Sequence, residues 1–183
     1  MVSRILLFLV LAFPAIGAEV AGVKLEDQIQ PGNLVLNGAG LRKRLFFQVY
    51  AIGLYLPKKT GNAQEAIASP GPKRVAIHML RNVGAAEFSE ALAEGIRANH
   101  AEAEAKALEP RVQELSAIMA EVKEAKKGMV IALDFKENEM HLLVDGKARG
   151  RAIAGEDFYR ALLRIWLGPR PVQDDVKKAL LGG

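Results

Sequence analysis

The stretch LNGAGLRKRLFFQVYAIGLYL, from Leu36 to Leu56, contains the features that decide the fold of the first half of the chain. Residues 34–41 and 46–56 are rich in β-branched, aromatic and other apolar side chains, which predicts two strands. We expect these strands to form a hairpin that turns in the residues between them, although no Asn-Gly or Asp-Gly pair marks the turn. Arg42 and Tyr50 lie within this apolar stretch. They are therefore either solvated residues at an edge or polar groups that converge in an apolar place.

The apolar pattern of the remaining sequence predicts four more strands and four helices. Strand patterns cover 74–80, 129–134, 139–144 and roughly 148–153. Apolar residues at helical spacing indicate helices around 88–99, 108–122, 158–166 and 172–180. Because proline suits the first turn of a helix, we expect a break at Glu109-Pro110 between the first two helices. Antiparallel meanders with grouped helices predict an α+β fold, an open-faced sandwich in which an antiparallel sheet is backed by a layer of helices.

The N-terminus has the three-part pattern of a secretory signal peptide. A positively charged start, Met1 to Arg4, is followed by the apolar run 5–13 and by small residues at 16–18. The run is shorter than the roughly 20 residues that span a bilayer, so we expect no stable membrane span after cleavage. The sequence therefore predicts removal of residues 1–18, export to the periplasm, and a single domain over 19–183. An uncleaved anchor and a buried strand are the alternatives.

Composition and motifs exclude several classes of function. The formal net charge is +4, and the basic residues are spread along the chain rather than clustered with aromatics, so we expect no nucleic-acid binding. The sequence has no cysteine, which removes thiolate chemistry and zinc-thiolate sites. The three histidines, His78, His100 and His141, have no paired metal-ligand spacing, and 38–40 lacks the third glycine of a dinucleotide fingerprint. We therefore predict no metal and no cofactor.

Five short motifs, in their order along the chain, resemble the chalcone isomerase-like family in its bacterial exported branch. The motifs are LNGAGLR at 36–42, YAIGLYL at 50–56, the helix 158–168 ending in IWLG, PV at 171–172 and LLG at 180–182. The resemblance covers essentially the whole mature chain and implies the α+β fold described above. Plant members of the family close a chalcone into a flavanone, and other members bind fatty acids.

The resemblance carries over only one of the family's catalytic residues. Arg42 matches the family arginine that binds a carboxylate or an enolate-like oxygen. The other positions differ: Tyr50 stands for a threonine, Phe88 for a tyrosine, Gly95 for an asparagine, and Asp175 or Val176 for a second threonine. Loss of one group that stabilises a developing oxyanion can cost about 10²-fold or more in rate, so we do not expect isomerase activity of the plant type. Catalytic residues are not assigned.

The candidate ligand-binding residues are Gly38, Gly40, Arg42, Tyr50 and Phe88. Glycines lack a Cβ and allow backbone and ligand to approach closely. Arginine presents a planar fork of donors that suits a carboxylate, and Tyr50 can add a hydroxyl. These residues predict that a fatty acid or a similar small apolar carboxylate binds in a cleft between the sheet and the helices.

Two further classes of function stay open at this point. An isomerase or intramolecular lyase acting on another substrate would need two titratable groups within hydrogen-bond reach in a pocket. A structural or partner-binding domain would have a cleft filled by Phe46, Tyr50 and Phe88. We expect Trp166 to be buried, because it shares an apolar helical stripe with Phe158; an exposed tryptophan used for partner binding is the alternative.

Overall fold

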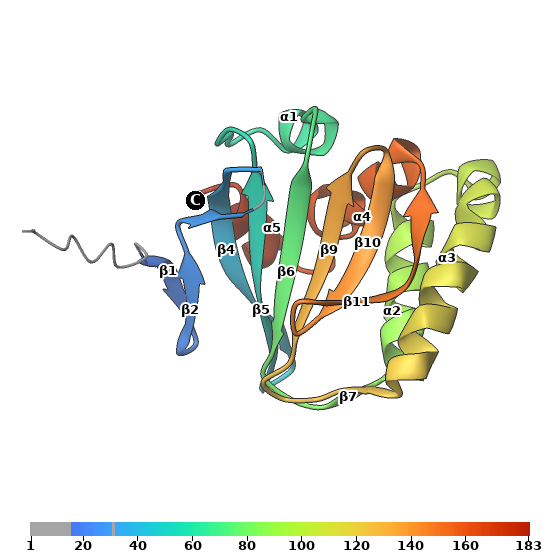
Figure 1. Cartoon of the computed structure of the whole chain (residues 1–183), viewed down its shortest axis with the longest axis horizontal. Helices are drawn as coiled ribbons and strands as arrows, with labels where there is room; N and C mark the ends of the chain where they lie inside the picture. Colours follow the sequence, from blue (N-terminus) through green and yellow to red (C-terminus); the bar gives the residue numbers. More distant parts are fainter. Residues whose placement is uncertain (1–15, 31) are drawn as a thin grey trace, which may run out of the picture.

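The computed structural model describes residues 16–30 and 32–183, and its main element is an antiparallel sheet of seven strands. The strand order is β11-β10-β9-β6-β5-β4-β3 (Figure 1). Their bounds are β3 Gln28–Ile29, β4 Leu34–Arg44, β5 Phe47–Leu56, β6 Lys73–Met79, β9 Val130–Lys136, β10 Glu139–Val144 and β11 Lys147–Ala154. The strands predicted from alternation and β-propensity are all present, within a few residues at their ends.

The helices pack on one face of this sheet, as the sequence predicts. They are α1 Ala63–Ala68, α2 Ala85–Ala98, α3 Glu102–Val122, α4 Glu156–Leu167 and α5 Asp174–Leu180. In Figure 1, α4 and α5 lie behind the sheet, and α2 and α3 stand together at its β10–β11 side. The sequence therefore forms the α+β fold of one sheet backed by helices.

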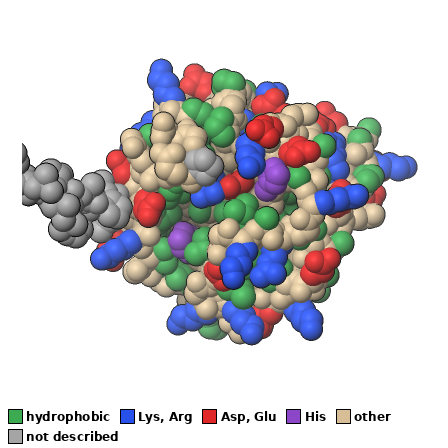
Figure 2. All heavy atoms as spheres, viewed as in Figure 1, with side chains coloured by type: hydrophobic (Ala, Val, Ile, Leu, Met, Phe, Trp, Pro, Cys, Tyr) green, Lys and Arg blue, Asp and Glu red, His purple; other side chains and the backbone are tan. Residues whose placement is uncertain are grey.

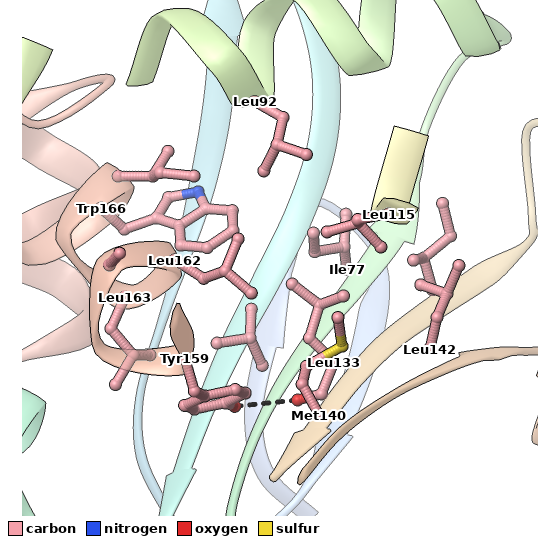
Figure 3. Packing of buried hydrophobic residues seen from close by; sticks show 14 of the residues in the cluster. Ile77, Leu92, Leu115, Leu133, Met140, Leu142, Tyr159, Leu162, Leu163 and Trp166 are labelled. Carbon is pink, nitrogen blue, oxygen red and sulfur yellow. Dashed lines mark hydrogen bonds between the residues drawn. The ribbon is translucent and has the colours of Figure 1, made fainter. Parts of the chain in front are cut away.

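Helix α4 is the centre of the core, because most of its side chains point away from solvent. Trp166 is 6% exposed, which confirms its predicted burial. Figure 3 shows Tyr159, Leu162, Leu163 and Trp166 directed from α4 towards the other buried side chains. The buried hydroxyl of Tyr159 donates a hydrogen bond of 2.8 Å to the carbonyl oxygen of Leu133, so its polar group remains satisfied.

The other face of the sheet is partly covered by a small hairpin that the sequence analysis did not predict. Strands β1 Ile16–Val20 and β2 Val23–Glu26 pair with each other. Leu25 from this hairpin packs with Tyr55 of the sheet in a second, smaller core. Residues 1–15 of the predicted signal peptide lie outside the described residues, and Ala18, its last residue, pairs with Leu25.

Two predicted boundaries were wrong. The β4–β5 turn lies one residue later than expected, since Arg44 pairs with Phe47 and leaves Leu45 and Phe46 as the turn. No helix break occurs at Pro110, which lies inside α3. Pro110 and the residue one turn earlier, Lys106, are both exposed, so water can replace the hydrogen bond that proline removes.

One further pair of short strands lies beside helices α2 and α3, which are separated by residues 99–101. Strands β7 Val83–Gly84 and β8 Glu124–Ala125 pair at the ends of these two helices. None of the helices in the described part of the chain has both the length and the apolar character needed to cross a bilayer.

Candidate functional site

The motif LNGAGLR, residues 36–42, lies within strand β4 and contains a β-bulge. The bulge changes which face of the sheet the following side chains point to. Leu36 pairs with Tyr55 and Gly38 pairs with Leu54, so Asn37 is the extra residue of a β-bulge. The side-chain amide of Asn37 donates to the carbonyl oxygen of Leu180 at 2.7 Å. This buried asparagine therefore fixes the end of α5 to the sheet.

The close approach expected at the two glycines of this motif is made by α5. A Cβ on Gly38 would lie 2.6 Å from the carbonyl oxygen of Leu180, and one on Gly40 would lie 3.2 Å from the Cβ of Ala179. Both glycines therefore face the helical layer. Their small size allows a helix of the chain itself to lie directly on β4.

Arg42 and Tyr50 are brought together by the register of the hairpin. They are directly paired across β4 and β5, so their side chains emerge side by side on the same face. Tyr50 packs against the main core that the helices cover. Of the two alternatives raised by the sequence, the structure therefore supports convergence rather than two separate solvated positions.

The hydroxyl of Tyr50 has a fixed partner in α4. The indole Nε1 of Trp166 donates to it at 3.0 Å. An indole N–H can only donate, so the hydroxyl accepts this bond and its own proton remains available for another acceptor. Burial raises the pKa of Tyr50, while the bond from Trp166 and the charge of Arg42 act in the opposite direction. The phenol therefore remains neutral at physiological pH and can donate.

The guanidinium of Arg42 contacts neutral oxygens. It donates to the carbonyl oxygen of Lys43 and, at 3.3 Å, to the side-chain oxygen of Gln173. The same Gln173 oxygen accepts from the backbone N–H of Lys43 at 2.9 Å. Within the described residues, the ion pairs include Arg44, Lys73 and Arg74 but not Arg42. This leaves a partly buried cation with spare donors and no acidic partner from the described chain.

The remaining positions carried over from the family serve packing. Phe88 is half-buried in the first turn of α2 and packs against the main core. A Cβ on Gly95 would lie 2.9 Å from a methyl group of Ile165, so this glycine permits contact between α2 and α4. On α5, Val176 is buried and Asp175 is exposed. Phe46, expected in a filled cleft under the partner-binding interpretation, is 98% exposed.

Two cavities lie at the opposite end of the sheet from Arg42 and Tyr50. The larger, about 460 Å³, is lined by residues that include Pro72, Phe135 and Glu156. The smaller, about 200 Å³, borders Lys73 and Arg74. Tyr50 pairs with the last residue of β6 and Lys73 is its first, so neither cavity adjoins the predicted site.

Lys73 is a buried cation that the sequence analysis missed. Its ammonium donates to the carbonyl oxygens of Ser69 and Gly71 and lies 3.4 Å from a carboxylate oxygen of Glu156. Burial lowers the pKa of Lys73, and Glu156 partly opposes that change. The signal was present, because alternation in Lys73, Val75, Ile77 and Met79 puts the lysine on the core face.

The three histidines do not converge. His100 hydrogen-bonds through Nδ1 to the carbonyl oxygen of Ile96, and His141 lies 3.8 Å from Glu139. Burial lowers the pKa of His78. In the part of the chain that the structure describes, His, Asp and Glu do not group in threes that could hold a metal ion.

The chain is similar to known proteins both in sequence and in fold. The sequence model of a family described as chalcone isomerase-like matches residues 17–182. A search of curated proteins by sequence gave no match. The fold is similar to the crystal structure of a fatty-acid binding protein from Arabidopsis thaliana, with a TM-score of 0.70 and 14% sequence identity. The alignment covers 87% of this chain and 92% of the plant chain. At this identity the structural similarity establishes a shared fold.

Proposed function

This chain belongs to the chalcone isomerase-like family, and on that basis we propose that it binds a fatty acid or a similar apolar carboxylate. The observation that carries the proposal is the pair formed by Arg42 and Tyr50 across the hairpin. Arg42 supplies a permanent positive charge with spare donors, and Tyr50 supplies a neutral hydroxyl whose proton is free. A carboxylate is the acceptor that matches both groups.

The acyl chain would follow the apolar face of the hairpin. Ile52, Leu54 and Leu56 continue from Tyr50 along β5 on the side covered by α4 and α5. These residues are closely covered, so entry of a chain requires a helix to move away from the sheet. Helix α5 is the shorter of the two, with 7 residues against 12 in α4, and its movement would break the bond from Asn37 and expose the buried side chains of Val176 and Leu180.

The location of the protein is part of the same proposal. A charged start, a short apolar run and small residues at 16–18 support export to the periplasm with loss of a signal peptide. A binding protein in that compartment would carry an apolar ligand through water. The similarity in fold to a plant fatty-acid binding protein supports this role.

Calorimetric titration of delipidated protein with medium- and long-chain fatty acids tests the proposal. Charged hydrogen bonds to a carboxylate contribute about 1.5–3 kcal/mol, so Arg42→Ala should weaken binding by roughly 10- to 150-fold. Arg42→Lys should restore only part of the affinity, because an ammonium cannot make the two-pronged contact. Tyr50→Phe should cost less, since it removes one neutral donor and keeps the ring.

Arg44→Ala is the matched control. Arg44 is in the same strand, two residues away, and its partner is Glu87 at an exposed ion pair of 3.1 Å. It should bind fatty acid as the parent does. Equal affinity of the parent and Arg42→Ala, or no binding by the parent, would contradict the proposal.

A further inference from the structure

The turn between β4 and β5 exposes three large apolar side chains in succession. Leu45, Phe46 and Phe47 are 85%, 98% and 61% exposed. They are the exposed large hydrophobic residues of the part of the chain that the structure describes. An isolated surface leucine needs no explanation, but three adjacent residues at the tip of a projecting hairpin form a patch.

The sequence of this turn is not the one that hairpin geometry favours. Leu45 has a φ of 54°, in the left-handed region where Gly, Asn and Asp are the usual residues. Two-residue hairpin turns favour Asn-Gly or Asp-Gly for the same reason. Here the turn carries a leucine and a phenylalanine that add nothing to the core. This conflict between turn geometry and residue type indicates a role outside the fold.

Basic side chains surround this apolar tip. Lys43 and Arg44 precede it and are exposed. The guanidinium of Arg81 lies 5.4 Å from the ring centre of Phe47, which links the tip to the next loop.

A second exposed basic pair extends the charge. The backbone N–H of Lys127 donates to the side-chain oxygen of Asn82 at 2.9 Å, so Lys126 and Lys127 lie beside the Arg81 loop. Acidic residues also lie at this end: Glu87 pairs with Arg44, Glu124 and Asp145 lie near the second basic pair, and Asp174 and Asp175 follow Gln173, which contacts Lys43. Figure 2 shows Lys and Arg side chains projecting along the lower edge of the molecule, where Figure 1 places this turn.

We propose that the β4–β5 tip docks on an anionic lipid membrane, with Leu45, Phe46 and Phe47 inserted at the interface and the surrounding Lys and Arg side chains against the head groups. Apolar residues on one side and basic residues around them are the combination that interfacial membrane binding requires. A second copy of the chain fits less well. Three side chains are far fewer than the roughly 20–30 residues that each partner contributes to a stable protein interface.

The docking surface and the proposed ligand site are separate sets of residues. Arg42 and Tyr50 face the helical layer, and the inserted residues face solvent. Docking therefore goes beyond fatty-acid binding, and each proposal can fail without the other. If both hold, the tip would bring the carboxylate end of the ligand site close to the lipid.

Co-sedimentation of the protein with lipid vesicles tests the proposal. The parent and every variant carry the same native N-terminus. Phosphatidylcholine vesicles with and without phosphatidylglycerol are compared at low and high salt. The parent should prefer the anionic vesicles, and salt should weaken its binding. Leu45→Ser/Phe46→Ser should reduce partitioning at least about tenfold, because the transfer of each apolar side chain into the interface is lost. Unchanged thermal melting would show that the variant is folded.

Two pairs of sequence-adjacent lysines, one near the tip and one far from it, provide a matched test of charge. Lys126→Gln/Lys127→Gln should weaken binding to anionic vesicles by roughly tenfold or more. Lys58→Gln/Lys59→Gln removes the same charge at the far end of β5, about 30 Å from the tip at the rise of a strand. It should bind within about twofold of the parent. Equal losses in both variants would overturn a localised docking surface.

Insertion itself is read from Phe46→Trp with brominated lipids. The parent has a single tryptophan, Trp166, which is buried and should not be quenched. The introduced indole should be quenched and shifted to the blue on anionic vesicles. Absence of quenching, or parent-like vesicle binding by Leu45→Ser/Phe46→Ser, would overturn the proposal. So would a parent that dimerises through the tip and is monomeric in that variant.

Discussion

The hydroxyl of Tyr50 accepts a hydrogen bond from the indole N–H of Trp166, and the charge of Arg42 lies beside it. A threonine, a tyrosine and an asparagine of the family's catalytic set are replaced here by Tyr50, Phe88 and Gly95. In the structure Phe88 packs against the core and Gly95 allows two helices to meet. Positions 88 and 95, which would carry a hydroxyl and an amide donor to a substrate, therefore carry packing groups, whereas Tyr50 keeps a hydroxyl.

We expect the purified protein not to cyclise naringenin chalcone above the uncatalysed rate. Each missing donor to a developing oxyanion costs about 10²–10³-fold in rate, and more than one is missing. The loss of chalcone absorbance with and without protein checks this. Rapid turnover at low protein concentration would contradict it and would require another catalytic set.

Lys73 should give stability a pH dependence of its own. Its pKa in the folded protein is below the 10.5 of an unperturbed lysine, mainly because it is buried. Between those two values the unfolded chain binds the additional proton, so the free energy of unfolding rises with pH up to about 10.5. Relative to Lys73→Met, the parent should therefore gain stability as the pH rises from neutral towards 10.5, the unperturbed value. Denaturant unfolding of both proteins across this range measures the difference, and parallel curves would refute the assignment.

At the scale of elements, β4 and α5 depend on each other through Gly38. A Cβ there would overlap the backbone of Ala179 and Leu180. Because backbone cannot rotate away as a side chain can, Gly38→Ala should destabilise the protein by about 1–3 kcal/mol or more.

Gly61→Ala serves as the control for this change. A Cβ at Gly61 would meet its nearest neighbour, the carbonyl oxygen of Leu181, at 3.6 Å, which is an ordinary contact. The midpoint of urea unfolding should fall for Gly38→Ala and stay close to the parent value for Gly61→Ala. Equal midpoints for all three proteins would show that α5 does not rest on this glycine.

Local pattern predicted the elements well and their exact ends less well. Alternation placed Ile52 and Leu54 on a strand, and helical spacing placed Trp166 in the core, because both periods follow directly from backbone geometry. The β4–β5 turn was misplaced because no turn residue marks Leu45-Phe46. Pro110 wrongly predicts a helix break, because the solvent exposure that makes proline tolerable inside α3 cannot be seen in one sequence.

Only part of the candidate site could be predicted from the sequence, because some of its contacts join residues that are far apart along the chain. Arg42 and Tyr50 are eight residues apart in one hairpin, so strand pairing could bring them together. The bond between Tyr50 and Trp166 joins residues 116 apart, and the Arg42–Gln173 bond joins residues 131 apart. Contacts over such separations depend on how the helices pack on the sheet, and the periodicity of the local sequence does not predict this packing.

For the molecule as a whole, the proposed export would decide the compartment in which a ligand is bound. We expect mature protein to begin at about residue 19, after the small residues 16–18. Such cleavage would leave only Glu19 and Val20 of β1 to pair with β2. N-terminal sequencing of protein from its own cells checks this, and a mature chain that still begins at Met1 would count against it.

The proposed function depends on a carboxylate bound by Arg42. The most direct measurement is the carboxyl ¹³C resonance of a labelled fatty acid bound to the protein, followed as pH falls, in the parent and in Arg42→Ala. An opposite charge within about 4–6 Å lowers the pKa of a carboxyl by about 1–3. The bound carboxyl should therefore stay ionised to a lower pH in the parent than in the variant. Identical titration curves in the two proteins, or no bound resonance in the parent, would contradict the proposed function.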